Sequence, residues 1–345
     1  MKYRAITDGI AINEDVDPSS SNIDSIVLDC DGTLVRINRS YNACIIETAG
    51  RILSSILGDG LKGFVDEQMI LAFRMSGGFN NDVDTTYACI LAALAYNDDS
   101  SNPSNSNPSN LDGARIFAHE MARHADSRGV ESVEEYLASI GKAHVVKAAR
   151  EYTGYPGLVG SSMLATLFDE LFYGKELFKA MHGIEPRFHN GKGFIEYDEV
   201  VVSKDCLSML KARFNGKVAI VSGRSRIAAE YALRDMLEYF NMDASVFIED
   251  EDKYVKRNGL RMNVTKPTPY ALLKSLKAMN ASSAIVVGDS AEDLIMARNA
   301  SKDGYRTYFV GVYGTSIDAE KQKQMFINMR SDAIIENVNL LPRLL

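Results

Sequence analysis

The sequence predicts an α/β protein in which a doubly wound parallel sheet is interrupted by an inserted, mainly α-helical domain. Beyond residue 196, short apolar runs alternate with segments of helical periodicity. Such repeated strand–helix units are typical of a parallel sheet with helices on both faces. Between the first apolar run, at 24–29, and this alternating region, almost every periodic segment is helical. The run at 24–29 therefore belongs to the sheet, and the segment after it is an insertion.

The first half of the chain contains one predicted strand followed by helices. Residues 1–23 are polar and are predicted to form an arm or a short hairpin. Residues 24–29 are predicted to be a buried parallel strand, because continuous aliphatic and β-branched residues suit a strand covered on both faces. Asp82 is the expected N-cap of a following helix. Apolar residues at three- and four-residue steps predict helices at 41–56, 64–75, 83–97, 112–126, 131–140, 142–152 and 161–181.

The second half of the chain carries the remaining strands. Strands are predicted at 217–222, 244–248, 284–288, 306–312 and 332–335, and helices at 199–214, 225–240, 269–279, 291–300 and 317–329. The predicted core, a Rossmann-like sheet domain, comprises residues 1–35 and 196–345, and the helical domain comprises residues 36–195. Within the latter, the Ser/Asn/Pro-rich tract 97–110 is predicted to be a flexible loop, because it cannot bury apolar surface.

The composition excludes several classes of function. The 345 residues carry a formal net charge of −8 and no long basic run, which argues against nucleic-acid binding and against docking on a membrane surface. No apolar run reaches the roughly 18 residues of a membrane helix, and the first residues lack the apolar segment of a signal peptide. The four cysteines show no CxxC spacing and are expected to be free thiols in a reducing compartment. We therefore expect a cytoplasmic protein.

Four polar clusters fall just beyond four different predicted strands of the sheet domain. The carboxyl ends of parallel strands meet at one edge of a sheet, and ligands bind there in open α/β proteins. We therefore expect the four clusters to lie together. They are residues 29–33 (Asp-Cys-Asp-Gly-Thr), 222–224 (Ser-Gly-Arg), 266–267 (Lys-Pro) and 288–293 (Gly-Asp-Ser-Ala-Glu-Asp).

These residue types suit the cleavage of a phosphate ester. A carboxylate can attack phosphorus and form an aspartyl-phosphate, and Asp29 is the better candidate because it directly follows the strand. A second group must protonate the leaving alcohol and later activate water. Asp31 lies two residues further on, in the turn, where it can reach the leaving group. The sequence therefore predicts Asp29 as the nucleophile and Asp31 as the acid–base catalyst.

Two carboxylates beside a phosphate require compensating positive charge. Mg²⁺ prefers a few carboxylate oxygens together with water and phosphate oxygens, and Asp289 completes such a site with Asp29 and a backbone carbonyl. Lys266 adds a fixed positive charge. The hydroxyl of Ser222 and the amide of Gly223 can donate hydrogen bonds to phosphate. Gly32 is expected to allow a close approach of the backbone to the phosphate.

Each cluster alone also has a purely structural interpretation. Asp-x-Asp-Gly is common in turns, Ser222-Gly223 could be a simple strand-to-helix turn, and Lys266 could be an exposed loop residue. Ser290 with Asp293 fits a capping box. Arg224 could attract anions or form a surface salt bridge. The four clusters in this order are more specific than any one of them.

The same residues resemble the motifs of the haloacid dehalogenase (HAD) superfamily of phosphatases, over about residues 24–35 and 196–312. The resemblance implies the nucleophile and acid–base roles given above for Asp29 and Asp31. It implies that Ser222 binds phosphate and that Lys266 is the lysine of the third motif. The inserted domain then corresponds to the helical C1-type cap of subfamily IA. The implied activity is hydrolysis of a small phosphomonoester metabolite.

The resemblance also implies the metal site. In the family, Mg²⁺ is bound by the side chain of the first aspartate, here Asp29, and by the backbone carbonyl of the second, here Asp31. The fourth motif contributes acids at Asp289 and Asp293, of which Asp293 can also act without touching the metal. The second aspartate disfavours a dehalogenase, since a leaving halide needs no proton. A phosphomutase acting on a sugar phosphate and a catalytically inactive binding protein remain as alternatives.

Several polar residues of the helical domain are candidates for contact with the substrate. The loop from Gly77 to Asp84 and the segment after residue 35 resemble a group of subfamily IA hydrolases. The expected contacts are Arg39, Asn80, Asn81 and Asp82, with Arg36 and Arg74 as further candidates.

Overall fold

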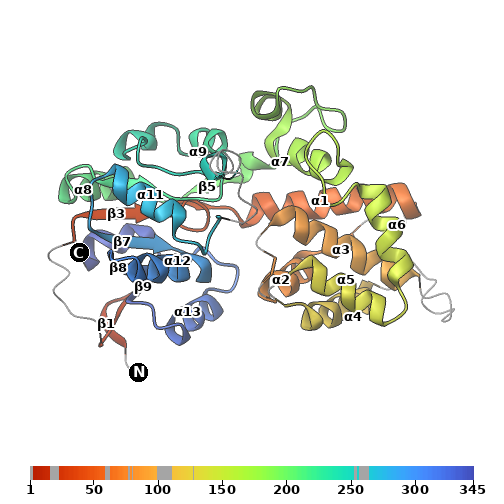
Figure 1. The fold of residues 1–345 in the computed structure, drawn as a ribbon, viewed down its shortest axis with the longest axis horizontal. Coiled ribbons are helices and arrows are strands. Elements are labelled where there is room, and N and C mark those ends of the chain that lie inside the picture. The colour runs from red at the N-terminus through yellow and green to blue at the C-terminus, as the bar shows by residue number, and fades with distance from the viewer. Residues whose placement is uncertain are drawn as a thin grey trace. The chain divides into compact units, whose positions relative to one another are not determined.

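The computed structural model describes residues 3–15, 23–58, 63–76, 78–79, 81–98, 111–126, 128–251, 255 and 264–345. Within it the chain divides into two compact units (Figure 1). The core unit comprises Met1–Asn38 with Asp198–Leu345, and the inserted unit comprises Arg39–Tyr197. Of the predicted loop 97–110, residues 99–110 lie outside the described residues.

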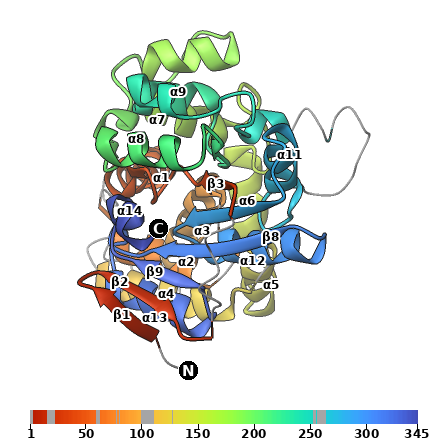
Figure 2. The same cartoon turned by 90° about the vertical axis from the view of Figure 1, so that its left-hand side faces the viewer.

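A mostly parallel sheet forms the centre of the core unit. Its order is β1-β2-β9-β8-β7-β3-β6, and the strands from β9 to β6 run parallel. The β1–β2 hairpin pairs antiparallel with β9 and lies at one edge of the sheet (Figure 2). The strands are β1 Tyr3–Thr7, β2 Ile10–Asn13, β3 Ser25–Leu28, β6 Val218–Ile220, β7 Ser283–Gly288, β8 Arg306–Val312 and β9 Ala333–Ile335. The predicted fold class and the N-terminal hairpin are confirmed.

Helices cover both faces of this sheet. Successive side chains of a strand point to opposite faces, and β3 shows the result. Ile26 and Leu28 pack in one apolar cluster with Leu207, whereas Val27 packs in the other with Leu272. The helical elements of the core unit are α8 Lys204–Arg213, α9 Arg226–Leu233, η4 Arg234–Tyr239, α11 Tyr270–Ala278, α12 Ala291–Lys302, α13 Ala319–Asn328, η5 Val338–Leu340 and α14 Leu341–Leu344.

Three predicted elements of the core unit differ from the structure. At 244–248 a single parallel bridge joins Val221 and Val246, because the amide of Ile220 donates to the side chain of Ser245 instead of a backbone carbonyl. The segment 199–214 begins with β5, Glu199–Val200, which pairs with β4, Val35–Arg36, before α8 starts. The predicted helix 225–240 is split into α9 and the 3₁₀ segment η4.

The inserted unit is built from helices. They are α1 Asn38–Leu57, α2 Glu67–Met75, α3 Asp82–Asn97, α4 Leu111–His124, α5 Val130–Ser139, α6 Ala143–Thr153, α7 Met163–His182 and the 3₁₀ segment η3 Phe194–Tyr197. Helix α3 is its central element, since every residue from Thr85 to Ala93 is buried. The predicted N-cap of α3 is wrong by one residue. Asn81 caps the helix through its side chain, which accepts from the amides of Val83 and Asp84.

Two further expectations concern the whole chain. None of the helices in the described ranges is long and apolar enough to cross a membrane. All four cysteines are buried free thiols.

Candidate active site

The register of the sheet brings the predicted motifs to one edge. Leu28, the last residue of β3, pairs with Val287 of β7 and with Ile220 of β6. The amide of Asp29 then donates to the carbonyl of Val287 over 2.8 Å. Asp29 therefore follows directly on the hydrogen-bonded ladder, as the continuous apolar run of β3 predicts, and its backbone is held rigidly.

Lys266 is part of this edge. Its Nζ atom lies 2.5 Å from Oδ1 of Asp29 and 2.6 Å from Oδ1 of Asp293, and its side chain is only 13% exposed. The interpretation of Lys266 as an exposed loop lysine is therefore wrong. Burial lowers the pKa of Lys266, but the charges of Asp29 and Asp293 outweigh burial and raise it overall. The ammonium group stays protonated and supplies a fixed positive charge.

Three carboxylates crowd around this single ammonium group. Oxygens of Asp29, Asp289 and Asp293 all lie within 4.8 Å of one another. Burial raises the pKa of Asp29. Burial, followed by the charges of Asp29 and Asp293, raises the pKa of Asp289 well above its usual value. The excess negative charge and the all-oxygen donor set fit a hard divalent cation such as Mg²⁺.

Asp293 is held by the start of α12. Its Oδ2 accepts from the amide of Ser290 over 3.2 Å and from the hydroxyl over 2.6 Å, and the Ser290 hydroxyl accepts from the Asp293 amide in return. This is the predicted capping box, which is confirmed. Since Oδ1 of Asp293 faces Lys266, the geometry favours a role in fixing Lys266 over direct contact with a metal.

Gly32 makes room for Asp289. It has a φ of +71°, and a Cβ atom at this position would lie 1.9 Å from Oδ2 of Asp289. Two residues that the sequence did not single out hold the same loops. The hydroxyl of Thr315 donates to the Gly32 carbonyl, and the side-chain amide of Gln322 donates to the Asp289 carbonyl. The group that lies so close to residue 32 that only glycine fits there is therefore the carboxylate of Asp289.

Asp31 is ion-paired with a buried arginine. Nε of Arg224 lies 2.7 Å from Oδ1 of Asp31, and Nη2 of Arg224 lies 2.5 Å from Oδ2 of Asp198. The Arg224 side chain has no exposed surface, so the interpretation as a surface salt bridge is wrong. Asp198 was not predicted at all, because no motif marks it in the sequence.

Ser222 lies next to Arg224 at the end of β6. Its buried hydroxyl accepts from the amide of Arg224 over 3.2 Å, which leaves its own O–H as a donor. Gly223 is exposed. A serine donor beside an accessible backbone amide suits phosphate oxygens, which accept hydrogen bonds. The phosphate contacts predicted for Ser222 and Gly223 remain proposals.

The candidate residues of the inserted unit take part in local structure. Arg74 binds Asp82 over 2.6 Å and the side chain of Asn42 over 2.9 Å, and Asn81 caps α3. Arg36, in the core unit, pairs with Glu199. Asn80 lies outside the described residues. The substrate contacts predicted for Arg39, Asn81 and Asp82 stay predictions.

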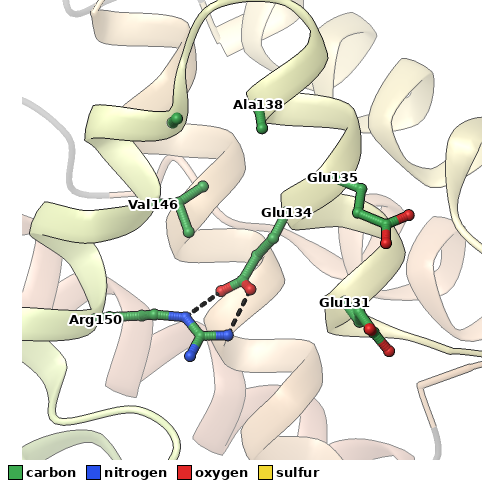
Figure 3. A pocket seen from close by; sticks show the side chains of 7 residues that line it. Glu131, Glu134, Glu135, Ala138, Val146 and Arg150 are labelled. Atoms are coloured by element: carbon green, nitrogen blue, oxygen red, sulfur yellow. Dashed lines mark hydrogen bonds and ion pairs between the residues drawn. The ribbon is translucent and has the colours of Figure 1, made fainter.

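A hollow on α5 and α6 offers different chemistry (Figure 3). Glu131, Glu134 and Glu135 line it together with Arg150, whose guanidinium pairs with Glu134 over 2.5 Å. Glu135 is paired in turn with Arg128 over 2.8 Å, so Glu131 gives this hollow a net negative charge. Such a surface repels a phosphate group and does not suit an anionic ligand.

Comparison with known proteins identifies the family of the chain. The family profile of haloacid dehalogenase-like hydrolases matches residues 23–301. The chain therefore belongs to this family of hydrolases. No match is found among curated protein sequences.

Two solved structures share the fold. A crystal structure from a structural genomics consortium has 15% identity and a TM-score of 0.62, and the alignment covers 93% of this chain and 98% of the other. A phosphatase from Thermococcus thioreducens has 20% identity and a TM-score of 0.54, and the alignment covers 88% of this chain and 98% of the other. At these identities the likeness concerns the fold.

Proposed function

We propose that this hydrolase is an Mg²⁺-dependent phosphatase that cleaves a small phosphomonoester through an aspartyl-phosphate at Asp29. The observation that carries the proposal is the buried contact between Lys266 and Asp29, with the carboxylates of Asp289 and Asp293 beside it. A nucleophilic carboxylate, a fixed ammonium group and a cation-binding set of oxygens are the parts that attack on phosphorus needs. The fold of the Thermococcus thioreducens phosphatase is consistent with this activity.

In the first step an oxygen of Asp29 attacks phosphorus. The bond between phosphorus and the leaving oxygen breaks, its electron pair stays on that oxygen, and Asp31 donates the proton that forms the alcohol. In the second step Asp31 takes a proton from water, the water oxygen attacks phosphorus, and the carboxylate of Asp29 is released together with phosphate. Lys266, the Ser222 hydroxyl and the Gly223 amide stabilise the negative charge on the phosphate oxygens.

The side chains of Asp29 and Asp289 and the backbone carbonyl of Asp31 would hold Mg²⁺. When bound, the ion supplies charge that lets the phosphate and the carboxylates occupy the same site. Asp293 fixes Lys266, and Gly32 gives Asp289 the space that it needs. The helical inserted unit serves as a cap that limits access to small phosphorylated metabolites.

The direct test measures phosphate release from p-nitrophenyl phosphate and from a panel of phosphorylated metabolites. We expect release that stops with EDTA and returns with Mg²⁺. Activity that is indifferent to chelation would remove the metal from the proposal. Conversion of one sugar phosphate into its isomer without phosphate release would identify the alternative, a phosphomutase. Absence of any turnover on the panel would favour an inactive binding protein.

Mg²⁺ is expected to raise the melting temperature, and more so at higher pH. In the metal-free protein the raised pKa values of Asp29 and Asp289 mean that the folded state holds more protons than the unfolded state. Stability therefore falls as pH rises from the ordinary carboxyl range through these raised values. At about 100 times its Kd, a bound ion adds about 2.7 kcal/mol, which corresponds to several degrees in a chain of this size.

Differential scanning fluorimetry with and without Mg²⁺, at about pH 5 and about pH 7.5, measures this shift. In Asp289→Asn the metal-free protein should melt higher than wild type at the upper pH, because one crowded charge is gone, and the response to Mg²⁺ should shrink. A full Mg²⁺ response in this variant would show that the ion binds elsewhere.

A further inference from the structure

A fully buried arginine joins the proposed acid–base catalyst to the segment that returns from the inserted unit. Arg224 contacts Asp31 through Nε and Asp198 through Nη2. Asp198 is also buried, with 3% of its side chain exposed, and directly precedes β5. Removing the guanidinium of Arg224 and the carboxylate of Asp198 from water is costly, whereas the side chain of Asp31 stays 23% exposed. The reaction proposed above uses Asp31 alone and does not account for the other two groups.

Backbone hydrogen bonds also link the turn that bears Asp31 to the segment that bears Asp198. The amide of Gly32 donates to the carbonyl of Val35 over 2.8 Å, and Val35 pairs with Val200 of β5. The turn that bears Asp31 and the segment that bears Asp198 are thus linked through the β4–β5 pair. Arg224 adds a side-chain link between them. Because the guanidinium is a rigid planar fork, a contact that fixes Nη2 also fixes the direction of Nε.

We infer that Arg224 and Asp198 are positioning residues that hold the carboxyl group of Asp31 in the orientation for proton transfer to the leaving oxygen. This inference rests on the proposed function. The ion pair engages Oδ1, and the carboxyl group transfers its proton through the other oxygen. A general acid acts only within hydrogen-bond reach of its target. Without the arginine, the side chain of Asp31 can rotate in its turn, and proton transfer becomes rare.

The loss of a positioned acid has a particular kinetic signature. A good leaving group, such as a nitrophenolate, departs without a proton, whereas an alkoxide needs one. Variants at Arg224 or Asp198 should therefore show a small loss of kcat/KM for p-nitrophenyl phosphate and a large loss for phenyl and alkyl phosphates. Replacing a residue that serves only the fold should lower kcat/KM by a similar factor for every substrate. The quantity to measure is kcat/KM, which reports the steps up to formation of the aspartyl-phosphate.

The experiment compares Arg224→Met, Arg224→Lys and Asp198→Asn with wild type, all loaded with Mg²⁺. For Arg224→Met we expect a loss of about 10²-fold or more on an alkyl phosphate and less than about 5-fold on p-nitrophenyl phosphate, from the usual size of acid catalysis. Arg224→Lys keeps the positive charge but lacks the planar guanidinium, and its loss of activity on the alkyl phosphate should be smaller than that of Arg224→Met. Asp198→Asn should show the same trend with a smaller size, because the guanidinium keeps its contact with Asp31.

Arg226→Lys is the matched control. Arg226 lies two residues further on, over the ring of Phe247 and 4.0 Å from Asp250, and contacts neither Asp31 nor Asp198 in the described structure. This variant should keep the wild-type dependence on the leaving group. If Arg224→Met does not fold, Arg224→Lys and Asp198→Asn decide the question.

The two levels of the proposal fail in different ways. If wild type hydrolyses phosphomonoesters and loses this activity in Asp29→Asn, the proposed function stands. Uniform losses across leaving groups in the Arg224 and Asp198 variants, or no losses, would then overturn the positioning role alone. If wild type hydrolyses none of the phosphomonoesters, or Asp29→Asn is fully active, the proposed function falls, and the inference falls with it.

Discussion

Asp29→Asn is expected to lower phosphatase turnover by at least about 10⁴-fold, the size of loss seen when a nucleophile is removed from a catalytic unit. The amide keeps the shape of the side chain but cannot attack phosphorus. Steady-state release of phosphate from p-nitrophenyl phosphate, in saturating Mg²⁺, measures the effect. The side chain of Asp29 is buried against Lys266, so circular dichroism should accompany the assay to show that the variant is folded.

Asp24→Asn provides the control for a carboxylate at the opposite end of the same strand. Asp24 precedes β3, and its side chain accepts from the amide of Ser283 over 3.1 Å. This variant should lose some stability and keep its turnover. Near-wild-type activity in Asp29→Asn, with Asp24→Asn equally active, would show that Asp29 is not the nucleophile.

Gly32→Ala is expected to reduce activity by about 10²-fold or more, the scale of loss for a displacement of about 1 Å in a catalytic group. The added methyl group would lie 1.9 Å from Oδ2 of Asp289, so either the carboxylate or the turn must move. The positive φ adds backbone strain of about 1–2 kcal/mol. We expect a weaker response of the melting temperature to Mg²⁺, together with the loss of phosphate release.

Gly216→Ala is the control that separates backbone strain from the steric clash with Asp289. Gly216 has a φ of +78°, close to that of Gly32, but a Cβ atom there meets no heavy atom within 4 Å. This variant should lose stability by a similar amount and keep both its activity and its Mg²⁺ response. An unchanged Mg²⁺ response in Gly32→Ala would contradict the role assigned to the Gly32–Asp289 contact.

The sequence predicted the main features of the core because they depend on local patterns. The apolar runs that became β3 and β7 are continuous and are followed directly by acidic residues, so both the strands and the positions of Asp29 and Asp289 could be read from the chain. The strand expected at 244–248 shows the limit. Its apolar pattern is that of a strand, but the side chain of Ser245 accepts from the amide of Ile220 and interrupts the ladder. No pattern in one sequence reports such a contact.

The sequence could predict the candidate site residues that belong to a recognisable motif. It could not predict which polar residues the fold would bury. Lys266 and Arg224 both lie in polar surroundings in the sequence, and a surface position was a reasonable interpretation for each. The structure buries both, because aspartates from distant parts of the chain surround them. Asp198 has no neighbour in sequence that marks it, and only its contact with Arg224 gives it significance.

The place of β9 in the sheet has a consequence for how the chain folds. β9 lies between β8 and β2, so the sheet of the core unit joins strands from opposite ends of the sequence. The inserted unit, in contrast, is one continuous segment, in which helices that follow each other in the chain, such as α3 and α4 or α5 and α6, pack together. Local contacts form fast, and pairing between distant segments is slow. During synthesis the helical unit can form first, whereas the β1–β2 hairpin must wait until β9, Ala333–Ile335, has been made before it finds its partner strand.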